Sequence, residues 1–381
     1  MELSPTQQAF ELIKKSKKIL IIVPEVTNGD AIGGALGLSL GLQKLGEKEV
    51  DFISPGHIPE NLMFLPGSSQ TKNVLETSRE FIISLDLSKT RAKQLRYNTK
   101  GNYLNIYIQP EEGSFKEEDV KTSMGKFQND LIITIGLPDL EMLGKIYDEN
   151  AEFFYEVPIL NIDHHSTNDN YGQVNLVEIT ASSSSEIISE LLKSFGENII
   201  DEEIATCLLT GITAATRSFQ NAKTSPKTLN LAANLITLGA NQKKLVYYLY
   251  KSRSMKLLKL FGRALARIQQ DKENKITWSL LSAGDFEKTS ASGEEVPQVL
   301  KEITEISASQ NIIMLLIETR KNEVKGILRT GKGIDKEKIR AFLEGEFFQD
   351  FITFHVKDKT IKEVEGETLE RLKEFLSGLN I

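Results

Sequence analysis

The run Pro158-Ile159-Leu160-Asn161-Ile162-Asp163-His164-His165-Ser166-Thr167-Asn168 changes abruptly from apolar to polar residues. Its first half is typical of a buried strand in a parallel sheet, because such strands are nearly continuous in apolar residues. Asp163 stands where this strand should end. Ligands of open α/β sheets bind beyond the carboxyl ends of the strands, so Asp163, His164 and His165 are predicted to lie where chemistry occurs.

The two adjacent histidines support the same prediction. The chain contains only four histidines, at positions 57, 164, 165 and 355. A lone histidine is most often an ordinary core or surface residue. A carboxylate followed directly by two imidazoles instead suits a divalent metal or a phosphate. We therefore take Asp163, His164 and His165 as the candidate catalytic residues.

A strand, a turn and a helix near the N-terminus form a second candidate site. Residues 19–23 predict a buried strand, and residues 31–40 predict a helix rich in small residues. The polar turn between them contains Asp30. Free amide groups and the dipole at a helix N-terminus favour a bound anion there. Helix capping by Asp30 would explain the same pattern, and the sequence leaves both interpretations open.

The whole chain limits the possible functions. Its 381 residues suffice for two domains, and its net charge of −7 gives no general attraction to a nucleic-acid backbone. The single cysteine, Cys207, excludes a disulfide framework and a cysteine metal cluster. The sequence shows no membrane-length apolar run, and its first residues lack the apolar core of a signal peptide. We expect a cytoplasmic protein without a membrane segment.

The run NIDHHSTNDNYG at residues 161–172, followed by SSSSEIISELL at residues 182–192, resembles the DHH family of phosphoesterases. The resemblance implies a manganese- or magnesium-dependent hydrolase of phosphate esters in short oligonucleotides, cyclic dinucleotides, nucleoside bisphosphates or pyrophosphate. It also implies a Rossmann-like, mostly parallel α/β domain flanked by helices. A smaller α/β domain that binds the nucleotide end of the substrate should follow, with a cleft between the two. Such proteins often form homodimers.

The metal motifs of the family are only partly present. Four expected ligand positions hold residues that ligate metals poorly or not at all, namely Pro24, Asn28, Gly136 and Ala215. The resemblance leaves Asp30 and His164 as metal ligands, with Asp163 supporting the histidines and His165 facing the phosphate. Two-metal hydrolysis needs several anionic ligands, one of them bridging. We therefore expect the manganese or magnesium site to be weak or lost.

Candidate phosphate-binding residues are spread along the chain: His165, Ser183, Ser184, Arg217 and Arg329. Ser183 and Glu186 have the spacing of a capping box, so a helix start explains them and a phosphate role would be additional. Arg217 occupies a family glycine position. Arg329 stands where the family's second domain has an arginine, and it could bind a phosphate with two parallel hydrogen bonds.

The predicted layout has a DHH-like domain at 1–245, a helical linker at 246–270 and a substrate-binding domain at 271–381. The stretch 80–125 is an insertion relative to the family, with strands expected at 81–85 and 103–108. Between those strands lies a basic cluster of Lys89, Arg91, Lys93, Arg96 and Lys100. Such clusters are usually solvated surfaces, although this one is the best candidate for phosphate contact outside the motifs.

Three functional hypotheses follow from these observations. The first is a catalytically inactive member of the family that binds or senses a nucleotide or a short oligonucleotide. The second is a working phosphoesterase whose rebuilt metal site uses Asp30, Asp86, Asp139 and the two histidines. The third is a purely structural partner in a homodimer.

Overall fold

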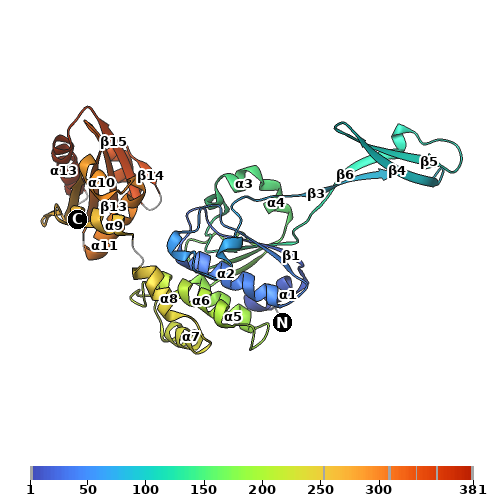
Figure 1. Cartoon of the computed structure of the whole chain (residues 1–381), viewed down its shortest axis with the longest axis horizontal. Helices are drawn as coiled ribbons and strands as arrows, with labels where there is room; N and C mark the ends of the chain where they lie inside the picture. Colours follow the sequence, from blue (N-terminus) through green and yellow to red (C-terminus); the bar gives the residue numbers. More distant parts are fainter. Residues whose placement is uncertain (1–2, 252–253, 308–309, 332, 349–350, 379–381) are drawn as a thin grey trace. The chain divides into compact units, whose positions relative to one another are not determined.

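The computed structural model describes residues 3–251, 254–307, 310–331, 333–348 and 351–378. The chain forms two compact units, residues 1–249 and 250–381 (Figure 1). Both units combine a β-sheet with helices, as the sequence predicts. Among the described residues, no helix is long and apolar enough to cross a membrane.

The first unit is organised around a five-stranded parallel sheet with the order β2-β1-β7-β8-β9. Its strands are β1 (Lys18–Ile22), β2 (Glu49–Ile53), β7 (Leu131–Ile135), β8 (Ile159–Asp163) and β9 (Val174–Val177). β7 and β8 are buried along their whole length, which confirms the parallel sheet expected from their apolar sequences. Because all five strands run in one direction, their carboxyl ends meet at one edge.

Helices cover both faces of this sheet. The α-helices of the first unit are α1 (Pro5–Lys15), α2 (Gly29–Lys44), α3 (Lys145–Glu149), α4 (Ala151–Glu156), α5 (Ser184–Lys193), α6 (Glu202–Ala215), α7 (Pro226–Thr237) and α8 (Gln242–Val246). Short 3-10 helices are η1 (Glu60–Leu62), η2 (Ser68–Gln70) and η4 (Leu140–Leu143). Ile19 and Ile21 of β1 pack in the core that contains α2, α5 and α6, whereas Leu20 and Ile22 pack with Phe153 of α4 on the opposite face.

The small residues of α2 allow it to approach α6 closely. A Cβ atom at Gly33 would lie 2.6 Å from the carbonyl oxygen of Cys207, closer than such atoms can stand. A larger residue at Gly33 would therefore push the two helices apart. This contact holds the N-terminus of α2 beside the carboxyl edge of the sheet.

Residues 79–127 form an extended β-ribbon that we call the arm (Figure 1). β3 (Arg79–Leu85) pairs antiparallel with β6 (Val120–Phe127), and β4 (Ala92–Lys100) pairs antiparallel with β5 (Tyr103–Pro110). A 3-10 helix, η3 (Glu117–Asp119), precedes β6. The strands predicted at 81–85 and 103–108 are confirmed. The basic cluster lies between those strands in the sequence, as expected, and three of its members, Lys93, Arg96 and Lys100, belong to β4, a strand that the sequence analysis missed.

The second unit contains a six-stranded mixed sheet with the order β10-β11-β12-β13-β15-β14. Its strands are β10 (Gln269–Asp271), β11 (Ile276–Leu281), β12 (Ile312–Arg320), β13 (Glu323–Thr330), β14 (Glu346–Phe348) and β15 (Phe351–Lys357). Its helices are α9 (Met255–Leu265), α10 (Ala283–Thr289), η6 (Gly293–Glu295), α11 (Val296–Ile306), α12 (Lys336–Leu343) and α13 (Ile361–Ser377). Apolar clusters on both faces of the sheet make this the smaller α/β unit that the sequence predicts.

The segment 246–270, where a helical linker is predicted, contains several elements. After α8 comes a π-helical turn, η5 (Tyr247–Lys251), and α9 starts anew behind Ser254, whose side chain accepts a hydrogen bond from the backbone N–H of Leu257. Leu257 and Leu260 of α9 are buried in a core cluster of the second unit. Helical periodicity alone does not reveal a new N-cap within such a pattern, so the sequence did not show where one helical element ends and the next begins.

Candidate functional site

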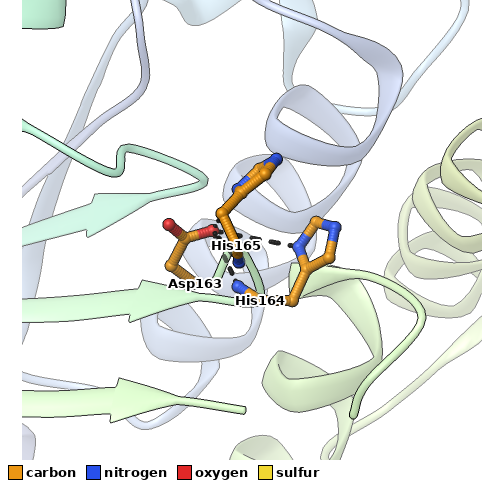
Figure 2. Close-up of side chains that lie close together, drawn as sticks. All are labelled: Asp163, His164 and His165. Atoms are coloured by element: carbon orange, nitrogen blue, oxygen red, sulfur yellow. Dashed lines mark hydrogen bonds and ion pairs between the residues drawn. The ribbon is translucent and has the colours of Figure 1, made fainter. Parts of the chain in front are cut away.

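The carboxyl edge of the first sheet brings Asp163, His164 and His165 together at the end of β8 (Figure 2). One ligand atom from each of these residues lies within 4.8 Å of the other two. The chain segments that follow β1 and β7 end at the same edge, where the N-termini of α2 and α5 also converge. The predicted catalytic cluster is therefore one compact group.

Asp163 is fully buried, and hydrogen-bond donors occupy both of its carboxylate oxygens. Oδ1 lies 2.6 Å from Nδ1 of His165 and accepts hydrogen bonds from the backbone N–H groups of His164 and His165. Oδ2 accepts a 2.7 Å hydrogen bond from the side-chain amide of Asn168. Burial alone would raise the pKa of Asp163, but the hydrogen bonds from His165 and Asn168 hold this pKa below its usual value. Asp163 therefore orients the histidine pair as an ionised carboxylate.

Hydrogen bonds among side-chain amides hold the side chain of Asn168 in position. The amide of Asn161, buried within β8, donates to Oδ1 of Asn168 at 2.7 Å and to Oδ1 of Asn175 at 3.2 Å. The sequence analysis did not single out these asparagines. Asn161 could have been noticed, because an amide within an apolar strand needs hydrogen-bond partners inside the protein.

The two histidines have different surroundings. Nδ1 of His165 bonds Asp163, and this hydrogen bond raises the pKa of His165 and leaves Nε2 for a ligand. His164 is more deeply placed, with 13% of its side chain exposed against 40% for His165. Burial lowers the pKa of His164. Its Nδ1 atom lies 3.2 Å from the Ser184 hydroxyl.

Asp30 reaches the site from the first turn of α2. Its carboxylate accepts hydrogen bonds from the backbone N–H groups of Ser184 and Ser185, at 2.7 and 3.0 Å, and from the Ser185 hydroxyl at 2.6 Å. Oδ2 of Asp30 also lies 3.7 Å from Nδ1 of His164. The two predicted metal ligands, Asp30 and His164, are thus adjacent. The carboxylate of Asp30 nevertheless serves first as an acceptor for the N-terminus of α5.

Residues 18–212 match the family model for the N-terminal domain of the DHH family. This chain belongs to the DHH family. It is 24% identical over 219 residues to the bifunctional oligoribonuclease and PAP phosphatase NrnA of Thermus thermophilus, an alignment that covers 58% of this chain and 65% of the relative. With the NrnA protein of Bacillus subtilis it shares 28% identity over 151 residues, or 39% and 48% of the two chains. The chain therefore spans less than two thirds of the length of these curated relatives.

A solved structure resembles this DHH protein over nearly its whole length. It is an exopolyphosphatase-related protein from Bacteroides fragilis, with a TM-score of 0.72 and 18% identity. The match covers 99% of this chain and 98% of the other. At this level of identity the likeness concerns the fold alone.

The four positions where DHH motifs led us to expect metal ligands offer no anionic group or imidazole. They are Pro24 behind β1, Asn28 before α2, Gly136 behind β7 and Ala215 at the end of α6. The side chain of Asn28 is already used as the N-cap of α2, where it accepts hydrogen bonds from the backbone N–H groups of Asp30 and Ala31. The residues present do not fit a pair of adjacent divalent cations, which needs several carboxylates, one of them bridging.

Two further aspartates were candidates for a rebuilt metal site. Asp139 caps η4 by accepting a hydrogen bond from the backbone N–H of Glu141. Asp86 lies on the arm beyond β3, where it accepts a hydrogen bond from the backbone N–H of Ser88. Among the described residues, neither aspartate belongs to a cluster of closely spaced metal-ligating side chains.

The predicted phosphate contacts are only partly brought together. Ser184 lies beside His164, whereas Ser183 is fully buried and caps α5 by accepting a hydrogen bond from the backbone N–H of Glu186. The predicted helix start is confirmed by this cap. Arg217 is exposed in the turn after α6, and Arg329 is half-buried in β13 of the second unit.

The turn after α6 also brings a lysine that the sequence analysis missed. Arg217, Ser218 and Phe219 have φ angles of 49°, 56° and 66°, a left-handed conformation that costs about 1–2 kcal/mol per residue. Thr216 stabilises this turn, because its hydroxyl accepts a hydrogen bond from the backbone N–H of Phe219 at 3.0 Å. Lys223 follows, and its ammonium group donates to the carbonyl oxygen of His164 at 3.3 Å. Strained turns of this kind often occur at functional sites.

We expect the pKa values of the two histidines to be shifted in opposite directions from the ordinary value of 6.5. The pKa of His165 should lie above it and that of His164 below it, because of the Asp163 hydrogen bond and of burial, respectively. NMR titration of the histidine ring protons, assigned with H164Q and H165Q variants, measures both values. In a D163N variant the pKa of His165 should fall towards its ordinary value. Equal pKa values for the two rings would contradict the described geometry.

The raised pKa of His165 has a consequence for stability. The stabilisation from its pairing with Asp163 is fully present below the pKa of His165 in the unfolded chain. It is lost as the pH rises through the higher pKa of the folded state. Urea denaturation of the wild-type and H165Q proteins on both sides of that range should show the difference shrinking towards high pH.

Proposed function

We propose that this DHH-family protein binds nucleotides or short oligonucleotides at the carboxyl edge of its first sheet without hydrolysing them. In this proposal it acts as a binding or regulatory protein. The observation that carries the proposal is the hydrogen bonding of the two carboxylates in the site. Donors from the chain itself occupy both carboxylate oxygens of Asp30 and of Asp163.

The charges of the site favour an anion over a pair of cations. Two divalent ions would bring four positive charges, and the carboxylates within the site are those of Asp30 and Asp163. Lys223 adds a positive charge beside the backbone of His164, and the pKa of His165 is raised. A phosphate group could therefore be held directly by His165 and Lys223 through charge-assisted hydrogen bonds. The names of the NrnA relatives, which refer to oligoribonucleotides and to PAP, support a nucleotide as the ligand.

The experiment combines calorimetry with thermal unfolding. Titration with manganese should show no tight saturable binding. With EDTA present, adenosine 3′,5′-bisphosphate or a dinucleotide should raise the melting temperature, because a ligand that binds only the folded state stabilises it. The apparent nucleotide affinity obtained from this shift should be at least tenfold weaker in the K223M and H165Q variants. K193M, which changes an exposed lysine at the other end of α5, is the matched control.

Two outcomes would reject the proposal. One is release of mononucleotides or phosphate at a steady rate with manganese present. The other is the lack of any thermal shift across the nucleotide panel, which would favour a purely structural role.

One observation favours an alternative, a working phosphoesterase that uses a single divalent ion. Oδ2 of Asp30 and Nδ1 of His164 lie 3.7 Å apart, a separation that lets both atoms contact one cation. In this case calorimetry would show one micromolar site, and D30N and H164Q would each remove it together with turnover. The same titration thus separates the two candidates.

The proposal also includes a homodimer and a cytoplasmic location. The homodimer follows from the resemblance to DHH proteins.

A further inference from the structure

The ladder of β4 and β5 in the arm has one apolar face and one polar face. Directly opposed residues share a face, because side chains alternate along each strand. One face carries three opposed pairs: Leu95 with Ile108, Tyr97 with Ile106, and Thr99 with Leu104. The other carries Gln94 with Gln109, Arg96 with Tyr107, Asn98 with Asn105, and Lys100 with Tyr103. Such alternation is typical of a sheet that buries one face.

The ladder of β3 and β6 repeats the arrangement. Three opposed pairs form an uncharged face: Phe81 with Met124, Ile83 with Thr122, and Leu85 with Val120. We call the two uncharged faces together the apolar face of the arm. It holds twelve side chains from both ladders, and none of them carries a charge.

In the described part of the chain this apolar face stays exposed. The exposed fractions are 63% for Phe81, 64% for Leu95 and 73% for Tyr97. A two-stranded ribbon is only marginally stable alone in water, and it normally needs packing against another layer. Contiguous apolar patches above a few hundred Å² mark interaction sites on soluble proteins. Among the described residues of the first unit, no second layer covers the arm.

We infer that the apolar face of the arm packs against the same face of a second copy of this chain, about a twofold axis. This inference rests on the homodimer of the proposed function and identifies its interface. A twofold contact needs one self-complementary patch, which is the commonest arrangement among oligomers. A face without charges also matches the interfaces of permanent homodimers, which resemble a divided domain core.

The available area agrees with a dimer. Aromatic side chains bury about 150–250 Å² each, and aliphatic ones somewhat less. The exposed side chains of the apolar face therefore offer on the order of 800 Å², which is about what one partner buries in a standard interface.

The charges of the arm exclude the opposite face as the contact between copies. The tip, residues 87–110, has no acidic residue and five basic ones. Lys89 is paired with Asp119, but Arg96 and Lys100 stand on the polar face. Two copies joined through that face would bring like charges together. Contact through the apolar face leaves the basic face in solvent, where these charges are screened.

The test compares two matched double substitutions in the full chain. Y97E/I106E places two carboxylates on a directly opposed pair of the apolar face, and N98E/N105E does the same on the polar face. Light scattering behind gel filtration, at about 1–100 µM, measures the mass. We expect twice the chain mass of 42.7 kDa for the wild type and N98E/N105E, and a single mass for Y97E/I106E. Circular dichroism and thermal unfolding without nucleotide verify that each variant remains folded.

A cysteine cross-link gives an independent measurement. Because Cys207 is buried, a T99C variant presents one reactive thiol, on the apolar face. Mild oxidation should yield a covalent dimer with T99C where residue 99 lies near the twofold axis, and none with N98C on the other face. A wild-type monomer at every concentration would overturn the dimer and this interface. A dimer that survives Y97E/I106E, or that both double variants dissociate, would overturn this interface. The nucleotide shift is scored separately, so either result leaves the binding proposal to its own test.

Discussion

The Asp30→Ala variant is expected to unfold with a free energy about 3–5 kcal/mol lower than that of the wild type. Asp30 is 4% exposed, and its carboxylate is the acceptor for the backbone N–H groups of Ser184 and Ser185 and for the Ser185 hydroxyl. Each buried donor left without an acceptor costs about 1–3 kcal/mol. The carboxylate also lies at the N-termini of two helices, α2 and α5, whose dipoles favour a negative charge. Urea denaturation in EDTA measures the loss.

The matched control is Asp139→Ala. Asp139 is also an aspartate at the carboxyl edge of the sheet, but it is half-buried and caps one backbone N–H group, that of Glu141. Loss of an ordinary cap costs about 1 kcal/mol. If Asp30→Ala were no more destabilising than Asp139→Ala, the carboxylate of Asp30 would be retained for a ligand. It would then not hold α5 in place.

The parts of the fold that depend on local pattern could be predicted from the sequence. β7 and β8 are apolar throughout because both of their faces are buried, and a run of that kind has few alternatives. The change to Asp163 and His164 marked the end of β8 and therefore the edge of the sheet. The spacing of Ser183 and Glu186 likewise located the start of α5.

The contacts that define the site could not be predicted in this way. Asp30 accepts hydrogen bonds from backbone amides 154 and 155 positions away in the sequence. The sequence had suggested that it caps its own helix or lies at an anion site, and neither interpretation describes this role. Asn168 reaches Asp163 through the shape of a loop. Lys223 reaches His164 because three residues adopt a left-handed conformation that glycine would adopt more easily. These contacts arise from tertiary structure, which hydrophobic periodicity does not describe.

The arm illustrates the same limit. The alternation of Leu95, Tyr97 and Thr99 with polar residues is visible in the sequence, but five basic residues in this stretch suggested a solvated surface. Whether alternating apolar and polar residues form a strand depends on the layer that packs against the apolar side chains. Among the described residues of the first unit no such layer covers β4, and this strand was therefore not predicted.

Aspartates introduced at three of the expected DHH ligand positions are predicted to create a site for two divalent ions. The triple variant N28D/G136D/A215D is expected to bind manganese at micromolar concentrations or more tightly, whereas the proposed function predicts no tight binding by the wild type. The added carboxylates would join Asp30 and His164 at the same edge of the sheet and offset the charge of the ions. Calorimetry measures the affinity, and the melting temperature should rise with manganese concentration, since a ligand at 100 times its Kd adds about 2.7 kcal/mol.

Each of the three changes is compatible with the backbone. Asn28 caps α2, and aspartate is as good an N-cap as asparagine. A Cβ atom at Gly136 would meet Ala31 at 3.5 Å and Ser184 at 3.8 Å, which are ordinary contacts. Its φ of 61° costs a side chain about 1–2 kcal/mol, and aspartate tolerates this conformation better than most residues. Ala215 ends α6, where a negative charge is unfavourable by about 0.3–1 kcal/mol until a cation binds.

The control variant N98D/N102D/Q109D adds the same charge on the arm, away from the site. If the triple variant bound manganese no better than this control, the three positions would not converge on one site. Pro24, the fourth expected ligand position, would then have to be changed as well. If instead the triple variant bound manganese and also hydrolysed dinucleotides, the substitutions at these positions would account for an inactive wild-type protein. The carboxylates missing at one sheet edge would then separate this chain from an active phosphoesterase, because the surrounding fold would already be complete.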